Sequence, residues 1–201
     1  IRYIFFIFLL KINIHLGLKN VLLLFKKNAY IGHCKKVFGM LKHTNHPFEV
    51  RLAILNYLSR LISCHQLIFL NIFPYLIKYL EPHQKYVTHF LALTAQCCHS
   101  LVPPEEIQPV MRVIADRFVN DKSRPESIAI GINVVREIIS RQPLAMTEEL
   151  VRDLVAYKKT HDKAVVAAAR SVLQLVRRTR PELLRKRDRA NAVGVDAPLP
   201  Y

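Results

Sequence analysis

The feature that most constrains the fold is a helical period of apolar residues that runs through residues 47–189. Segment 47–63 illustrates it, because apolar side chains there recur every three or four residues: Val50, Ala53, Ile54, Tyr57, Leu58 and Leu61. Such a pattern places one apolar stripe along a helix, and that stripe must be buried against another element. The composition agrees, with only 5 glycines and no tryptophan in 201 residues. The sequence therefore predicts an all-α protein.

Prolines and turn residues divide this region into eight predicted helices. They lie at about 47–63, 69–80, 83–100, 105–119, 125–141, from 148 onward, 162–179 and, in a short form, after Pro181. Thr147 is predicted to cap the sixth helix, with Glu148 and Glu149 at the positive end of its dipole. Pro109 is predicted to delay or kink the fourth.

Taken in pairs, these helices form a repeat. The odd-numbered ones begin near residues 47, 83, 125 and 162, which is typical of two-helix HEAT or armadillo units. One pair cannot bury its apolar face alone, so neighbouring pairs must stack. We therefore predict a HEAT/armadillo-like α-solenoid of about four helix pairs, rather than a closed bundle, which has no reason to repeat at this interval. We place the helical-repeat domain at 35–189 and a disordered tail at 190–201.

Residues 1–34 form a hydrophobic and basic segment of uncertain nature. Its longest apolar run, Tyr3 to Leu10, is far shorter than the roughly 20 residues that span a bilayer. It also lacks the basic start and small-residue cleavage site of a secretory signal. Because residue types encoded by AT-rich codons dominate it, one interpretation is a gene-model artefact, namely translated non-coding sequence. A membrane or targeting role and a genuine buried helix are the alternatives.

The net charge of +15 is concentrated at the two ends of the chain. Residues 1–46 contain no acidic residue, whereas basic and acidic residues nearly balance over 47–176. The strongest cluster comprises Arg177, Arg178, Arg180, Arg185, Lys186, Arg187 and Arg189. These side chains could contact RNA phosphates or an acidic protein, or serve as a nuclear import signal. They could equally belong to a solvated C-terminal helix whose arginines complement its dipole.

No motif indicates catalysis, a cofactor or a metal. The sequence lacks a phosphate-binding glycine loop, a nucleophile elbow and a His-Glu-x-x-His motif. His43 and His46 are three residues apart, but no second ligand pair follows at zinc-finger spacing. The four cysteines do not suggest a disulfide framework, and three lie in apolar runs as small hydrophobic residues would. We predict a non-enzymatic protein of a reducing compartment.

A collinear series of motifs resembles a known family. In chain order they are Pro47-Phe-Glu-Val-Arg-Leu52, Asn56-Tyr-Leu-Ser-Arg-Leu-Ile62, His65-Gln66, Glu81-Pro-His-Gln84, Leu101-Val-Pro-Pro104, Gly131-Ile-Asn133, Pro143-Leu-Ala-Met-Thr-Glu-Glu-Leu150, Tyr157-Lys158 and Lys186-Arg-Asp-Arg189. Over about residues 35–189 the chain resembles the central helical-repeat region of the Sda family, the "severe depolymerization of actin" protein homologues. Residues 1–34 and 190–201 depart from the family pattern.

The resemblance implies a nuclear, largely nucleolar protein needed for assembly of the 60S ribosomal subunit and export of its precursor. The implied partners are pre-60S particles, through assembly factors, ribosomal proteins or rRNA, and the family name records a link to actin cytoskeleton organisation. It implies no catalytic residue, cofactor or metal. Two alternatives stay open: a protein-only adaptor in nuclear transport or cytoskeleton organisation, and a membrane-associated protein anchored by residues 1–30.

Overall fold

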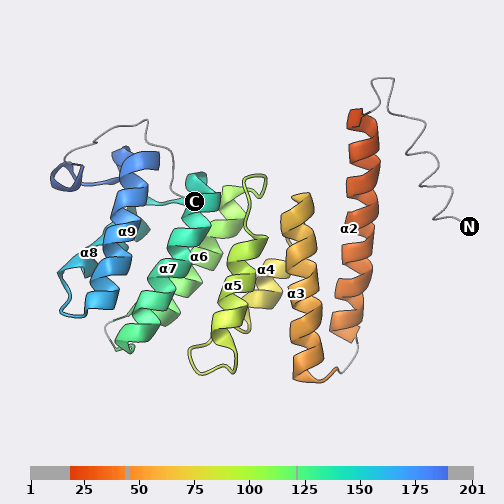
Figure 1. Ribbon diagram of the computed structural model, residues 1–201, viewed down its shortest axis with the longest axis horizontal. Coiled ribbons are helices and arrows are strands. Elements are labelled where there is room, and N and C mark those ends of the chain that lie inside the picture. The colour runs from red at the N-terminus through yellow and green to blue at the C-terminus, as the bar shows by residue number, and fades with distance from the viewer. Residues whose placement is uncertain (1–18, 44–45, 121, 190–201) are drawn as a thin grey trace, which may run out of the picture. The chain divides into compact units, whose positions relative to one another are not determined.

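The computed structural model describes residues 19–43, 46–120 and 122–189, and every regular element in these ranges is helical (Figure 1). The prediction of an all-α fold is confirmed there. The chain divides into two compact units, residues 1–69 and 70–201. The predicted tail at 190–201 and most of the predicted segment at 1–34 lie outside the described residues.

The first unit contains two antiparallel helices, α2 (Lys19–His43) and α3 (Phe48–His65) (Figure 1). Rings join them: Tyr30 stacks on His65 with centroids 3.9 Å apart, and His33 Nε2 lies 3.0 Å from the Tyr57 hydroxyl. The domain boundary predicted after residue 34 falls inside α2, where the Cys34 side chain is fully buried. The helix passes through this position without interruption.

The face predicted for α3 needs correction. Leu55, Leu58, Ser59 and Ile62 are its buried residues, whereas Val50 and Tyr57 are 41% and 50% exposed. Apolar residues cover more than one side of this helix, so the sequence period is compatible with two faces. Packing against other elements selects the face, and it leaves Tyr57 at the surface, where its hydroxyl meets His33.

The second unit contains six α-helices and four 3-10 turns within the described residues. The α-helices are α4 (Ile72–Ile77), α5 (Val87–Cys97), α6 (Pro104–Phe118), α7 (Pro125–Arg141), α8 (Glu148–Ala156) and α9 (Lys163–Thr179). The 3-10 turns are η2 (Pro143–Ala145), η3 (Tyr157–Lys159), η4 (Pro181–Leu183) and η5 (Lys186–Asp188).

These helices stack in two layers. In one layer α7 packs between α5 and α9, and in the other α4 packs against α6, while α6 joins α7 and α8 joins α9 across the layers (Figure 1). The helices α3, α5, α7 and α9 begin at residues 48, 87, 125 and 163, so successive starts are 39, 38 and 38 residues apart. This interval is more regular than the sequence suggested. It confirms the HEAT-like solenoid.

Several boundaries differ from prediction. The second predicted helix is shorter, because α4 covers only Ile72–Ile77. The next begins at Val87 rather than near residue 83, since the preceding Tyr86 takes a left-handed backbone conformation with φ of 61°. Pro109 does not delay α6, which begins at Pro104; the exposed position of Pro109 leaves the Glu105 carbonyl accessible to solvent. The predicted eighth helix is replaced by η4 and η5.

Hydrogen bonds between repeats follow the same interval as the helices. Arg117 Nη1 donates to the carbonyls of Ile77 and Leu80 at 2.9 and 3.1 Å. Gln142 Nε2 donates to the carbonyls of Ser100 and Val102 at 3.0 and 2.8 Å. Tyr157 donates its hydroxyl to the Val119 carbonyl at 3.3 Å. Each side chain thus supplies a donor to the preceding repeat, at a helix end or in the loop that follows a helix, where carbonyls lack intrahelical partners.

Candidate interaction surface

Helix α9 positions the predicted basic cluster at the end of the second unit. Asp162 caps its start, with Oδ1 accepting from the amides of Ala164 and Val165 at 2.8 and 3.1 Å. Its inward face is apolar, with Val165, Ala168, Ala169, Val172, Leu173 and Val176 all buried. After Thr179 the chain folds back through η4 and η5, where Leu184 and Asp188 are buried. The cluster is therefore attached to a folded end.

A buried carboxylate holds this end together. The Asp188 carboxylate accepts a hydrogen bond from Lys158 Nζ and lies 3.7 Å from Arg187 Nε. Its backbone carbonyl accepts from Arg177 Nε at 2.7 Å. The hydrogen bond from Lys158 is the main cause that holds the pKa of Asp188 below its ordinary value, with the nearby charges of Lys158, Arg187 and Arg177 adding to it.

Two more arginines fold the same segment. Arg189 donates through Nε to the Leu184 carbonyl at 2.6 Å and through Nη2 to the Glu182 carbonyl at 2.8 Å. Arg180 Nε donates to the Glu182 carboxylate at 2.7 Å, and this bond lowers the pKa of Glu182. Arg177, Arg180 and Arg189 are therefore committed to contacts within the chain. We call them the structural arginines.

Arg189 is also exposed, but the other exposed members of the cluster donate no side-chain hydrogen bond within the described residues: Arg178, Arg185, Lys186 and Arg187. We call these four residues the exposed basic set. Arg185 and Arg187 line a cavity of about 280 Å³ together with Lys158 and Lys159. The structure thus brings all seven predicted residues to one end of the second unit, and it leaves four of their side chains available for contact with an external anion such as a phosphate.

The basic surface continues onto α9 and η3. A second cavity of about 280 Å³ is lined by Lys158, Arg170, Leu173, Gln174 and Arg177. The sequence of α9, Lys163–Thr179, contains no acidic residue. Sequence reasoning did not connect Lys158, Lys159 and Arg170 with the cluster, because they precede it in the chain, the lysines in η3 and Arg170 earlier in α9. Their outward positions on α9 and η3 are the signal that could have linked them.

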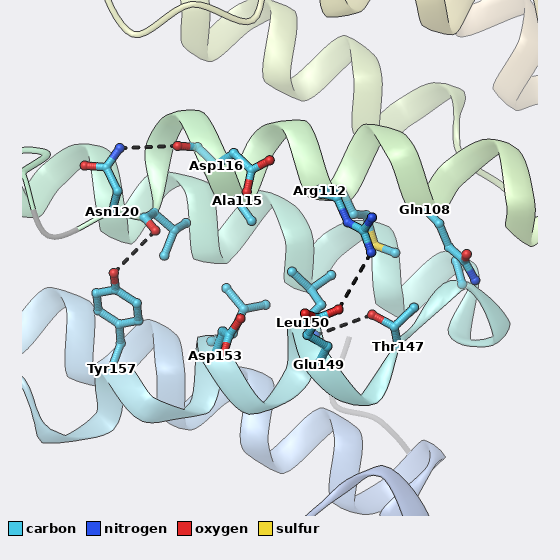
Figure 2. A pocket seen from close by; sticks show the side chains of 14 residues that line it. Gln108, Arg112, Ala115, Asp116, Asn120, Thr147, Glu149, Leu150, Asp153 and Tyr157 are labelled. Atoms are coloured by element: carbon cyan, nitrogen blue, oxygen red, sulfur yellow. Dashed lines mark hydrogen bonds and ion pairs between the residues drawn. The ribbon is translucent and has the colours of Figure 1, made fainter.

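A groove between α6 and α8 was not predicted from the sequence (Figure 2). Its volume is about 560 Å³, and its walls carry residues from Gln108 to Asn120 and from Thr147 to Tyr157. The Thr147 cap predicted for α8 is confirmed at one end of it, where Oγ1 accepts from the Leu150 amide at 3.4 Å.

Other classes of site are not seen in the part of the chain that the structure describes. No three His, Cys, Asp or Glu side chains cluster there in a way that could hold a metal ion. Within the same residues, no helix combines the length and apolarity needed to cross a membrane.

Residues 28–161 match the family model described as SDA1, HEAT repeat. The chain belongs to the SDA1 family. The matched region begins within α2, seven residues before the start that the sequence motifs suggested, and it ends just before α9. The SDA1 match thus includes the end of the segment that was predicted to depart from the family.

Curated SDA1 proteins are similar over most of this chain. Protein SDA1 homolog of Dictyostelium discoideum is 44% identical over 158 residues, which cover 79% of this chain and 21% of the relative. Protein SDA1 homolog of Drosophila melanogaster is 42% identical over 166 residues, covering 83% and 23%. Protein sda1 of Schizosaccharomyces pombe is 42% identical over 157 residues, covering 76% and 22%. The chain therefore spans less than a quarter of the length of these SDA1 relatives.

Proposed function

We propose that this SDA1-family chain is a non-enzymatic scaffold in ribosome biogenesis, acting in 60S subunit assembly and in nuclear export of pre-60S particles. Its place of action would be the nucleus and nucleolus, and its partners assembly factors, ribosomal proteins and rRNA of the precursor particle. A link to actin cytoskeleton organisation accompanies this role. The observation that carries the proposal is SDA1 family membership over residues 28–161.

The mechanism is surface contact spread over several repeats. The body of the solenoid is nearly balanced in charge, so it contributes shape rather than a general attraction for nucleic acid. The exposed basic set supplies the electrostatic part, because Lys and Arg side chains that neutralise phosphates release counterions and make binding sensitive to salt. The structural arginines act only by keeping this end folded.

Density-gradient sedimentation of the tagged chain from cells tests this function. We expect the wild-type chain to co-sediment with 60S precursors. A variant with Arg178, Arg185, Lys186 and Arg187 changed to Gln should associate more weakly and with a flatter salt dependence. The matched control changes four exposed basic residues elsewhere to Gln: Arg60, Lys78, Lys122 and Arg124.

The outcomes separate the function from its mechanism. A wild-type chain that never co-sediments with 60S precursors contradicts the function. Unchanged sedimentation and salt dependence in the quadruple variant contradict only the electrostatic mechanism.

Nuclease treatment tests the alternative of a protein-only adaptor, which the unpredicted groove between α6 and α8 favours. Such an adaptor stays bound to its partners after RNA is destroyed. Carbonate extraction of membranes separates the membrane-anchored alternative, because a ribosomal scaffold is released.

A further inference from the structure

The groove between α6 and α8 exists because these two helices do not pack directly along their length. The turn η2 lies at their base and contacts both α6 and α7. Met111, Ala145 and Leu154 line the groove as a buried apolar floor. The small side chain of Ala115 leaves space above it (Figure 2). The groove is thus a product of the fold, with an apolar base between two helical walls.

Contacts between the two walls cross the groove at two points. Near its start Arg112 Nη2 lies 3.8 Å from the Glu149 carboxylate. At the other end the Tyr157 hydroxyl donates to the Val119 carbonyl at 3.3 Å (Figure 2). Most backbone amides and carbonyls of both walls are used within the helices. Recognition in the groove therefore rests mainly on side chains.

Two of the side chains along this stretch are acidic. Asp116 extends from α6 and Asp153 from α8, and both are exposed at the groove. Neither forms an ion pair with another described residue, whereas the only cation among the lining residues, Arg112, is engaged with Glu149. This groove is therefore an acidic site in a chain whose net charge is +15.

We propose that the groove binds an extended segment of a partner protein that carries a lysine or arginine beside an apolar side chain. The carboxylates of Asp116 and Asp153 accept hydrogen bonds from the cation, which are stronger than bonds between neutral groups. The apolar neighbour contacts Leu150 and the floor. The groove volume falls within the range of about 300–1,000 Å³ found for ligand sites, which suits a few extended residues better than a whole helix.

Nucleic acid is a poorer occupant of the same groove. Its phosphates would face two unpaired carboxylates, and like charges brought together at an interface oppose binding. No member of the exposed basic set lines this groove, although Asp153 also borders the neighbouring cavity that Arg185 and Arg187 line. The proposed groove therefore adds a protein-binding site to this chain, and it stands whether or not the chain acts in ribosome assembly.

A synthetic peptide array tests the proposal on the intact chain. The probes are short peptides of alanine, leucine and serine with a central lysine, arginine or glutamate. We expect the wild-type chain to prefer lysine and arginine peptides by about tenfold or more. Asp116→Lys combined with Asp153→Lys should reverse that preference toward glutamate peptides, and Ala115→Phe should fill the groove and abolish binding of all three kinds.

Control variants make the result specific to the groove. Glu105→Lys combined with Glu126→Lys changes the same charge at exposed positions outside it and should keep the preference for basic peptides. The charge-reversal variant changes only exposed side chains, so it tests the groove even if Ala115→Phe unfolds the chain. A wild-type chain without preference for basic peptides, or a preference that survives the double reversal, overturns the proposal. The proposal would also be overturned if the wild-type chain bound an RNA oligonucleotide and the Ala115→Phe variant did not, because RNA would then be the occupant of the groove.

Discussion

Gly131 shows at the scale of one residue how tightly α6 and α7 cross. A Cβ atom at this position would lie 2.8 Å from Phe118 Cβ and 2.9 Å from Val119 Cγ2. Side-chain atoms do not approach so closely, so α7 needs glycine here despite the lower helix propensity of that residue. The close approach explains why glycine lies in the middle of a buried helical face.

Gly131→Ala should therefore destabilise the chain. We expect a loss of about 1–3 kcal/mol in the free energy of unfolding, the usual cost of overpacking a core, measured by urea denaturation. Gly39→Ala is the matched control, because nothing lies within 4 Å of a Cβ atom there and the better helix former should be neutral or stabilising by up to about 1 kcal/mol. Equal stability of the two variants would contradict the close crossing.

The cysteines differ in exposure and therefore in reactivity. Burial raises the pKa of the Cys98 thiol to about 12 and also raises the pKa of Cys34, whereas Cys64 is exposed. Because the thiolate is the reactive form, we expect one fast-reacting thiol with a disulfide reagent at pH 8, and Cys64→Ser should remove it. The remaining thiols should react only on unfolding. Reaction of Cys98 at the rate of Cys64 would contradict the buried position.

The C-terminal segment, residues 181–189, is held in place by a titratable group, the carboxylate of Asp188. Asp188 has a pKa below its ordinary value in the folded chain, mainly because Lys158 donates to it. A depressed pKa means that the stabilisation is fully present above the unfolded pKa of about 3.9 and is lost as the pH falls through the folded value. Docking of residues 181–189 should therefore persist at neutral pH and weaken only below about pH 4.

Asp188→Asn tests that element directly. Without the carboxylate, the Lys158 ammonium loses its charged partner, and we expect a cost of about 1–3 kcal/mol for docking of the turn. Amide chemical shifts of residues 181–189 measure the undocking, and the variant should lose the acid transition that the wild type shows. An acid transition that persists unchanged in the variant would assign the pH dependence to another group.

Elements could be predicted where local signals decide them. The bounds of α7 and α9 were predicted closely, as residues 125–141 and 162–179. Proline, capping residues and a single apolar face all indicate the same helix bounds there. The start of α5 could not be predicted, since it depends on the left-handed backbone of Tyr86, a residue type that rarely takes this conformation. The turns after Pro181 depend on burial of Leu184 and on the Asp188 network, which are tertiary contacts.

At the scale of the whole molecule, hydrogen bonds join each repeat to the preceding one. Gln142 is the most buried of these donors and holds two carbonyls, those of Ser100 and Val102. Gln142→Ala should cost about 1–3 kcal/mol, because both carbonyls lose their donor and the one of Val102 is buried. Gln174→Ala removes an exposed glutamine from α9 and should change the free energy of unfolding little. Equal urea midpoints of the two variants would contradict this coupling.

The solenoid itself was predictable, because a two-helix unit must repeat in sequence if it repeats in space. The groove between α6 and α8 was not, since it depends on the distance between two helices and on the small side chain of Ala115. The location of the basic cluster was evident from composition. Its division into structural arginines and an exposed basic set required the hydrogen bonds of Arg177, Arg180 and Arg189.

The salt dependence of binding to single-stranded RNA tests this division most directly. For each phosphate that the protein no longer neutralises, the slope of log K against log salt should become shallower by about 0.7. We predict a shallower slope for the variant with Arg178, Arg185, Lys186 and Arg187 changed to Gln, at unchanged thermal stability. Changing Arg177, Arg180 and Arg189 to Gln should instead lower the melting temperature. An unchanged slope in the first variant would contradict the assignment of the exposed basic set as the contact surface.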